Sequence, residues 1–194
     1  MTETIFSILL GIGLAASVGF RVFVPLFALS IASYYNVIPL NNNWEWIGDT
    51  PAMITLGIAT VLEIGAYLIP WFDNILDAIA VPLAAVAGTA VMLSTAADLD
   101  PTITWALAII AGGGTATAIK ASTSTARLAS TATTGGLANP IMGVVGSGTS
   151  IIMAILAFVA PILTIIIVLV ILWLIFKVFK WFKPKKEASI EKTP

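Results

Sequence analysis

The chain has 194 residues, 59% of them hydrophobic and 10% charged, with a mean hydropathy of +1.04 and a formal net charge of −1. Soluble globular domains carry about 25% charged residues, so this composition excludes a fully hydrated surface and makes the lipid bilayer the expected solvent. The absence of cysteine and histidine excludes disulfides, thiolate chemistry and most zinc, haem and iron–sulfur sites. We therefore expect an all-α, polytopic transmembrane helical bundle of about five spans, although roughly four to seven would fit this length.

The first apolar segment runs from about residue 5 to residue 35, longer than the ~20 residues that one span needs. Its N-terminal stretch MTETIFSILLGIG lacks the basic region of a cleavable signal peptide, so we expect it to be retained. The segment contains Gly19, Arg21 and Pro25, which predict a break or kink near its middle. A polar loop (41–51) with Trp44 and Trp46 suits the headgroup interface, and a second span is expected at 52–69.

The third predicted span covers 72–96. Asp100 or Thr102 can then cap a fourth segment that begins at Thr102, with Pro101 in its first turn. This segment runs into the polar stretch GTATAIKASTSTARLASTATTGG (114–136), after which TTGGLANP (133–140) predicts a break. The last and most apolar span is expected at 150–177.

The basic residues are concentrated at the C-terminus. Six of the nine lysines and arginines follow residue 176: Lys177, Lys180, Lys183, Lys185, Lys186 and Lys192. By the positive-inside rule the C-terminus is cytoplasmic, and with five spans the N-terminus is outside. We expect a single transmembrane domain (1–181) and a basic, then mixed-charge, disordered cytoplasmic tail (182–194) whose basic flank contacts anionic lipid.

The polar stretch at 115–134 is half serine or threonine and carries two cations, Lys120 and Arg127. Seven residues make two helical turns, so both cations share one helix face. Disorder would not explain this register between two spans. Small and hydroxylated residues also serve close helix packing, but the hydroxyl groups here exceed that need. We expect a helix that is buried in protein and partly lines water.

The segment from Gly13 to Arg21 aligns without gaps with the segment from Gly112, and Arg21 then falls on Lys120. Three spans separate the two copies, which would give inverted repeats (5–96 and 102–177) with broken or kinked first and fourth segments. Inverted repeats with interrupted helices are typical of transporters. The alternative is that two helices rich in alanine and glycine align by composition alone.

Three cations and three acids lie in or near apolar segments. A charge at bilayer depth costs at least ~2.5–3.5 kcal/mol, so such groups are normally paired or face water. We predict a substrate or ion pathway formed by Arg21, Glu63, Lys120, Ser124, Arg127, Thr131 and Asn139. Asp73 and Asp77, which are one helical turn apart, are the candidate ion-pair partners. A purely structural ion-pair network is the alternative interpretation.

Enzyme signatures are absent: the chain contains no GxSxG, HExxH or P-loop motif. Lys120 and Ser124 are spaced as a Ser–Lys dyad, but such a pair arises easily by chance in this stretch. We predict no catalytic residue, metal site or cofactor.

Three blocks of the chain share a family pattern: GLAASVGFRVFVPLFALS, TLGIATVLEIGAYLIPWFDNILDAIAVPLAAVAG, and the stretch from AGGG through TARLASTATTGGLANP. In this order, between about residues 5 and 175, they resemble the bacterial membrane proteins grouped as domain of unknown function 4126. The resemblance implies a small polytopic inner-membrane protein without an established activity. Where that family often has a histidine before the lysine-containing segment, this chain has Ile119, which argues against an essential histidine.

The sequence thus predicts a multi-pass protein of the bacterial inner membrane that acts as a transporter or channel for a small polar or anionic solute. The alternative is a structural or accessory subunit, whose small-residue faces pack against partner helices. The lipid bilayer is the expected partner, together with a second copy or another membrane protein, and no nucleic acid is expected.

Overall fold

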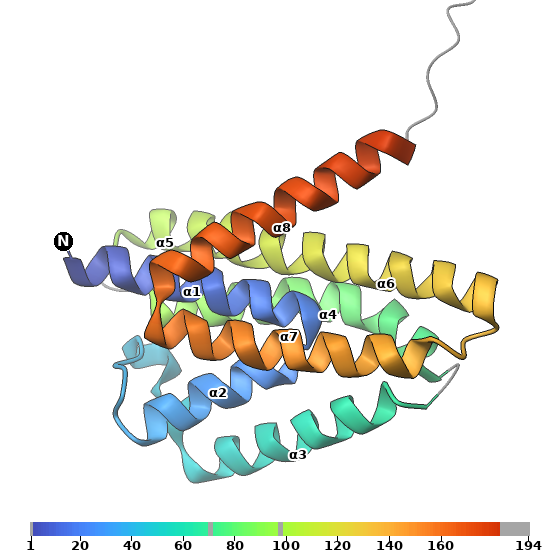
Figure 1. The fold of residues 1–194 in the computed structure, drawn as a ribbon. Helices are drawn as coiled ribbons and strands as arrows, with labels where there is room; N and C mark the ends of the chain where they lie inside the picture. The colour runs from blue at the N-terminus through green and yellow to red at the C-terminus, as the bar shows by residue number, and fades with distance from the viewer. Residues whose placement is uncertain (1, 70–71, 97–98, 183–194) are drawn as a thin grey trace, which may run out of the picture.

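The computed structural model describes residues 2–69, 72–96 and 99–182. Within these ranges the chain is helical without strands, so the all-α prediction is confirmed (Figure 1). The elements are α1 (Thr2–Phe20), α2 (Phe23–Tyr34), the 3-10 helix η1 (Asn42–Gly48), α3 (Thr50–Ala66), α4 (Phe72–Thr95), α5 (Pro101–Leu107), the π-helix η2 (Ala108–Gly113), α6 (Gly114–Thr134), α7 (Asn139–Val159) and α8 (Pro161–Phe182).

Five described helical segments are long and apolar enough to cross a membrane: 3–20, 72–95, 101–134, 139–159 and 161–181. A sixth arises if η1 and α3, which meet at 64°, count as one span. The expected number of about five is confirmed, but the prediction of one last span at 150–177 is wrong. That range contains two helices, because Pro161 lacks a backbone N–H and begins a new helix after Ala160.

The first apolar segment is broken at Arg21 and Val22, as its sequence predicts. Figure 1 shows α1 entering the bundle from one end and α2 returning toward that same end. The segment that follows α2 lines a hollow together with Glu3 and Ser7 of α1, so both arms of the hairpin reach one end of the molecule. We call Phe20 to Phe23 the hairpin tip; it lies inside the bundle.

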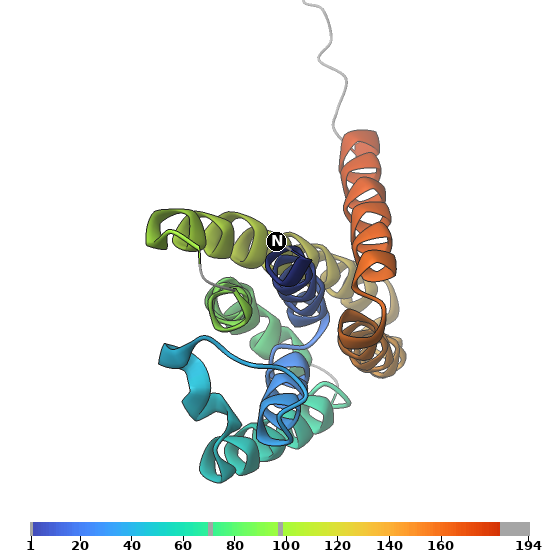
Figure 2. The same ribbon diagram turned by 90° about the vertical axis from the view of Figure 1, so that its left-hand side faces the viewer.

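The two ends of the bundle differ in content. One end, which we call the tryptophan end, carries the N-terminus, η1 and α5, and faces the viewer in Figure 2. The other, which we call the Gly135 end, carries the turn between α6 and α7. Gly135 has φ +64° in the left-handed region, where glycine is favoured, and this ends α6. The predicted break at 133–140 is therefore present, although Asn139 and Pro140 already belong to α7.

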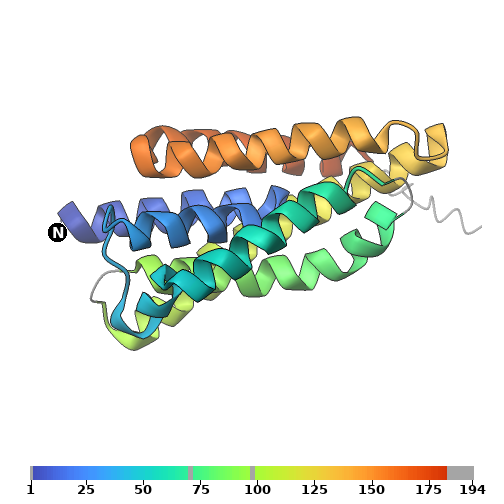
Figure 3. The same ribbon diagram turned by 90° about the horizontal axis from the view of Figure 1, so that it is seen from below.

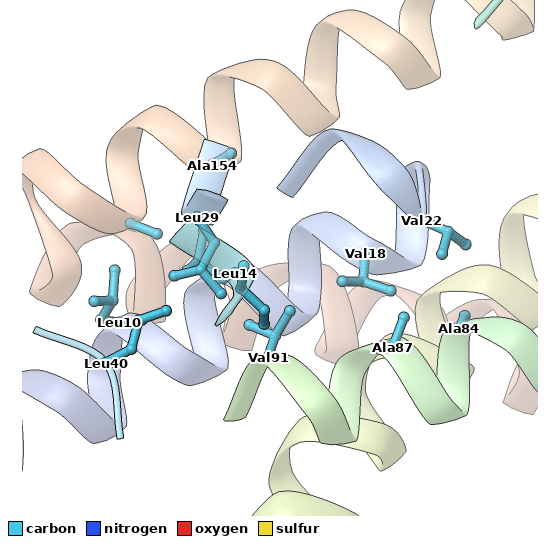
Figure 4. Packing of buried hydrophobic residues seen from close by; sticks show 13 residues of the cluster. Leu10, Leu14, Val18, Val22, Leu29, Leu40, Ala84, Ala87, Val91 and Ala154 are labelled. Atoms are coloured by element: carbon cyan, nitrogen blue, oxygen red, sulfur yellow. The ribbon is translucent and has the colours of Figure 1, made fainter. Parts of the chain in front are cut away.

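Helix α1 is the centre of the packing. Its residues Leu10, Leu14 and Val18, with Val22 just after it, form an apolar cluster with Ala84, Ala87 and Val91 of α4, Leu29 of α2 and Ala154 of α7 (Figure 4). Helix α7 lies alongside α1 (Figure 3), where the Ser17 hydroxyl donates to the Ser150 carbonyl at 2.7 Å. The apolar cluster fills the bundle between the hairpin tip and the tryptophan end.

The fourth segment is continuous rather than broken. Asp100 caps α5 by accepting from the Thr102 amide at 2.8 Å, and the helical run then extends from Pro101 to Thr134 with the π-helix η2 inside it. This differs from the first segment, where α1 ends directly before Arg21. The inverted repeat is not confirmed, because the helix that carries Lys120 does not turn back. The single domain remains a prediction, and the predicted tail beyond Phe182 lies outside the described residues.

The contact between α4 and η2 predicts a sensitive glycine. A Cβ atom at Gly112 would lie 2.5 Å from the Gly88 carbonyl oxygen and 2.7 Å from Met92 Cβ. Gly112→Ala should therefore destabilise the fold by about 1–3 kcal/mol, seen as a lower thermal unfolding midpoint in detergent. Gly148→Ala is the matched control, because nothing lies within 4 Å of its added Cβ and alanine is the better helix former. Equal midpoints for the two variants would contradict this packing.

Candidate functional site

Tyr67 lies at the centre of the buried charges. It follows the last turn of α3 and its side chain is 1% exposed. Three cations surround its ring: Arg21 Cζ at 3.9 Å, Arg127 Cζ at 4.7 Å and Lys120 Nζ at 5.3 Å from the ring centroid. A desolvated cation–π contact contributes up to about 2 kcal/mol. The aromatic ring therefore helps three like charges to share one apolar interior.

Arg21 lies at the hairpin tip, and among the described residues its hydrogen-bond acceptors are all neutral. Its Nε donates to Ser147 Oγ at 3.0 Å, its Nη2 to the Gly143 carbonyl at 2.7 Å and its Nη1 to the Phe20 carbonyl at 3.2 Å. Gly143 also lets the end of α3 approach α7 closely, since a Cβ there would lie 2.7 Å from the Tyr67 carbonyl oxygen. Among the described residues no carboxylate forms an ion pair with this guanidinium, which is held by α7 and by the Phe20 carbonyl.

Lys120 of α6 also reaches the hairpin tip. Its Nζ donates to the Phe20 carbonyl at 3.1 Å, and the side chain is 1% exposed. This carbonyl belongs to the last residue of α1, where the helix dipole favours a positive charge. The two residues that the sequence alignment paired, Arg21 and Lys120, therefore meet on one backbone oxygen.

Glu63 of α3 holds the other half of the hairpin tip. Its Oε1 accepts from the Val22 amide at 2.8 Å and its Oε2 from the Phe23 amide at 2.9 Å. These amides open α2 and would otherwise lack a partner. The Glu63 carboxylate also attracts Arg21 and Lys120 without forming an ion pair with either. Both helix ends at the tip are thus bonded to charged side chains.

Arg127 forms ion pairs with the two predicted acids, Asp73 and Asp77. Its Nε lies 3.0 Å from Asp77 Oδ2 and its Nη1 lies 3.5 Å from Asp73 Oδ2. The Tyr67 hydroxyl donates to Asp77 Oδ1 at 2.8 Å, which links this group to the ring. Within the described ranges these are the two ion pairs found, so Asp73 and Asp77 are the partners of Arg127 alone.

The remaining predicted residues extend the cluster toward the Gly135 end. The Arg127 Nη1 donates to the Asn139 carbonyl at 3.2 Å, and Asn139 Nδ2 donates to Thr131 Oγ1 at 2.8 Å. Asn74, which the sequence did not single out, donates to the same Thr131 oxygen at 3.2 Å. All seven predicted pathway residues and both predicted partners therefore lie in or beside the cluster. The Ser124 hydroxyl makes no hydrogen bond within the described residues.

Three buried polar atoms have no hydrogen-bond or ion-pair partner in the described part of the chain: Ser124 Oγ, Ser130 Oγ and Asn139 Oδ1. Most buried polar groups in proteins find a partner, so these atoms are unused bonding capacity beside the cations. In the described residues no group of three or more acidic side chains is arranged to hold a metal ion.

Most hydroxyl groups of α6 are satisfied by their own helix. Thr117, Ser122, Thr125, Thr131 and Thr133 donate to the carbonyl four residues earlier. This local bonding lets a hydroxyl lie in apolar surroundings. The expectation of a helix buried in protein therefore holds for one face: the stripe with Lys120, Ser124 and Arg127 is buried, whereas Thr125 and Thr133 lie on the exposed outer face.

Sequence reasoning missed the residues that complete the cluster. Tyr67 carried a signal, since it lies one turn after Glu63. Gly143 and Ser147 carried none, because a glycine and a serine in an apolar helix are read as packing residues.

A bundle with five described helical segments long and apolar enough to cross a membrane, which buries charged side chains around the hairpin tip, defines a multi-pass α-helical membrane protein. The chain belongs to the family described as Domain of unknown function (DUF4126), whose sequence model matches residues 8–181. This match confirms the resemblance and spans nearly all of the described helices. No curated protein and no solved structure matches the chain.

The ion pairs of Arg127 predict a coupled stability effect. Arg127→Gln leaves two buried carboxylates without their cation, which costs about 3–5 kcal/mol, so the unfolding midpoint in detergent should fall. Adding Asp77→Asn to this variant should recover part of the loss, because one unpaired charge is removed. Lys177→Gln, which alters an exposed lysine on α8, should leave the midpoint unchanged. Strictly additive losses in the double variant would argue against the pair.

Proposed function

We propose that the protein is a transporter or channel for a small anionic or polar solute, with Arg21, Glu63, Lys120 and Arg127 around its pathway. The hairpin tip is the observation that supports this most strongly. Irregular backbone inside an apolar bundle is found where it is buried in protein or lines a cavity. Transporter sites are commonly formed by interrupted helices whose ends face the solute.

The bonding of the cations favours an anionic solute. Arg21 and Lys120 both donate to the Phe20 carbonyl, and neither has a carboxylate in ion-pair contact within the described residues. An anion that replaced this carbonyl would gain two charge-assisted hydrogen bonds, which are about twice as strong as neutral ones. Ser124 Oγ, on the same helix face as Lys120, is free to donate a further bond.

The polar groups also favour one side of the bundle as the approach to this site. From the Gly135 end, Asn139, Thr131 and Arg127 lead toward Tyr67 and the hairpin tip. From the tryptophan end, the apolar cluster around Leu14, Val18 and Val91 stands in the way. A dry constriction of this kind resists ions until it is wetted, so in this proposal the pathway is closed toward the tryptophan end.

The proposal includes an inner-membrane location with a cytoplasmic C-terminus. The supporting feature is the charge distribution: α8 carries Lys177 and Lys180, and four more lysines follow. Lys177 Nζ lies 4.9 Å from the centroid of the Trp173 ring. A tryptophan beside lysines is typical of the headgroup region, where the basic flank would contact anionic lipid.

A structural or accessory role is the second candidate. It is favoured by the outer face of α6, where Thr125, Ala126, Ala129 and Ala132 are exposed. Small residues let transmembrane helices approach closely, so a helix of a partner protein or of a second copy would fit there. In this role the charged cluster serves only to hold the hairpin to α3, α6 and α7.

The two candidates differ in proteoliposomes. We expect the purified protein to conduct at least one of chloride, inorganic phosphate or acetate faster than protein-free liposomes. Lys120→Met should reduce this flux by about tenfold or more, since one lost charge interaction of 1.4 kcal/mol corresponds to tenfold.

Lys177→Met provides the matched control, because it makes the same substitution on exposed α8 and should retain the flux. Unfolding midpoints of both variants show that they remain folded. No flux in the unaltered protein for any of the three anions, or equal flux in Lys120→Met, would overturn the proposal. A stable stoichiometric partner recovered on purification would then favour the accessory role.

A further inference from the structure

The tryptophan end contains a hollow that the charged cluster does not explain. Its volume is about 430 Å³, and it is lined by Trp44 and Trp46 of η1, Trp105 of α5, and Asn41 and Asn43 beside them. We call it the tryptophan hollow. Ligand pockets in proteins commonly measure about 300–1,000 Å³. Figure 2 shows that η1 and α5 both lie at this end.

Local interactions hold the three rings in place. The Asn41 amide donates to the Ser94 carbonyl at 2.9 Å, which ties the loop before η1 to α4. The Trp44 and Trp46 rings stack with centroids 6.3 Å apart, and Trp44 also packs against the buried residues of α4. The cap at Asp100 fixes the start of α5 and thereby the position of Trp105.

Membrane-interface tryptophans alone do not account for this arrangement. Such residues anchor helices singly at the headgroup level, whereas here three of them, from two distant segments, line one hollow. Trp46 and Trp105 are 57% and 54% exposed, so their faces are accessible to a ligand.

The charged side chains around the hollow are acidic in the described residues. The sequence has no lysine or arginine before Arg21 and none from Val22 to Ile119, so the described segments at this end carry no cationic side chain. The acids at this end in the described residues are Glu3, Glu45, Asp49 and Asp100. The hollow itself is lined by uncharged side chains. Aromatic faces in a negative field attract organic cations, which bind over indole rings in particular.

From this geometry we infer that the tryptophan hollow binds an ammonium group, carried by a small soluble amine or by a lipid headgroup. The inference does not rest on the proposed transport function, because the site lies at the other end of the bundle and selects the opposite charge. A carbohydrate would also stack on tryptophan, but it carries no positive charge for the surrounding carboxylates to attract.

The test uses the full chain in nanodiscs of phosphatidylglycerol, which carries no amine, and calorimetric titration with choline. We expect saturable binding that weakens with added salt. The neutral carbon analogue of choline, dimethylbutanol, should bind about tenfold more weakly or not at all. Trp105→Leu should weaken choline binding by about tenfold, whereas Trp173→Leu, the same substitution on α8, should leave it unchanged.

A second variant covers the case in which Trp105→Leu does not fold. The double variant Glu45→Gln with Asp49→Asn changes two exposed side chains and should also weaken choline binding while the unfolding midpoint stays the same. Equal binding of choline and dimethylbutanol would overturn the inference. So would binding of maltose without any binding of choline.

The source of the ammonium group is assigned by a further arm. Nanodiscs in which half of the lipid is phosphatidylethanolamine should lower the apparent affinity for choline if a lipid headgroup is the natural occupant. Unchanged affinity in these nanodiscs, together with binding in phosphatidylglycerol, assigns the site to a soluble amine.

Discussion

The hydrogen bonds at the hairpin tip are the interaction on which the rest of the structure depends. Turning a chain inside an apolar bundle exposes the last carbonyls of one helix and the first amides of the next, and unpaired groups of this kind are costly away from water. Here Glu63 binds the amides of Val22 and Phe23, while Arg21 and Lys120 bind the Phe20 carbonyl. The buried charges are therefore part of what permits the hairpin, and the hairpin in turn fixes where the charges lie.

This arrangement divides the molecule into two unlike halves. Toward the Gly135 end, three cations surround Tyr67 and continue through Arg127 to Asn139. Toward the tryptophan end, α1 presents Leu10, Leu14 and Val18 to α4 and the interior is apolar. The described segments at that end then carry acidic side chains and no lysine or arginine.

Many residues of the site could be predicted from the sequence, but the contacts between them could not. Charged side chains in apolar segments stand out, so Arg21, Glu63, Lys120 and Arg127 were identifiable, and Asp73 and Asp77 were expected as partners. The alignment of Gly13–Arg21 with the segment from Gly112 paired Arg21 with Lys120, yet no repeat is confirmed and the two side chains share an oxygen instead. Tyr67 and Gly143 could not be ranked, because their importance lies in what contacts them.

The sequence by itself determined that lipid is the expected solvent, that the fold is all-α and that acids accompany the cations of the apolar segments. Hydropathy and charge are properties of the residues themselves and can be read along the chain. It also determined where helices stop at Arg21 and Gly135, since these breaks depend on local backbone chemistry. Only the tertiary structure decided that α2 turns back rather than continuing across, and that Pro161 separates two helices within one apolar run. It alone decided which acid faces which cation, because those distances arise from the packing of helices far apart in the chain.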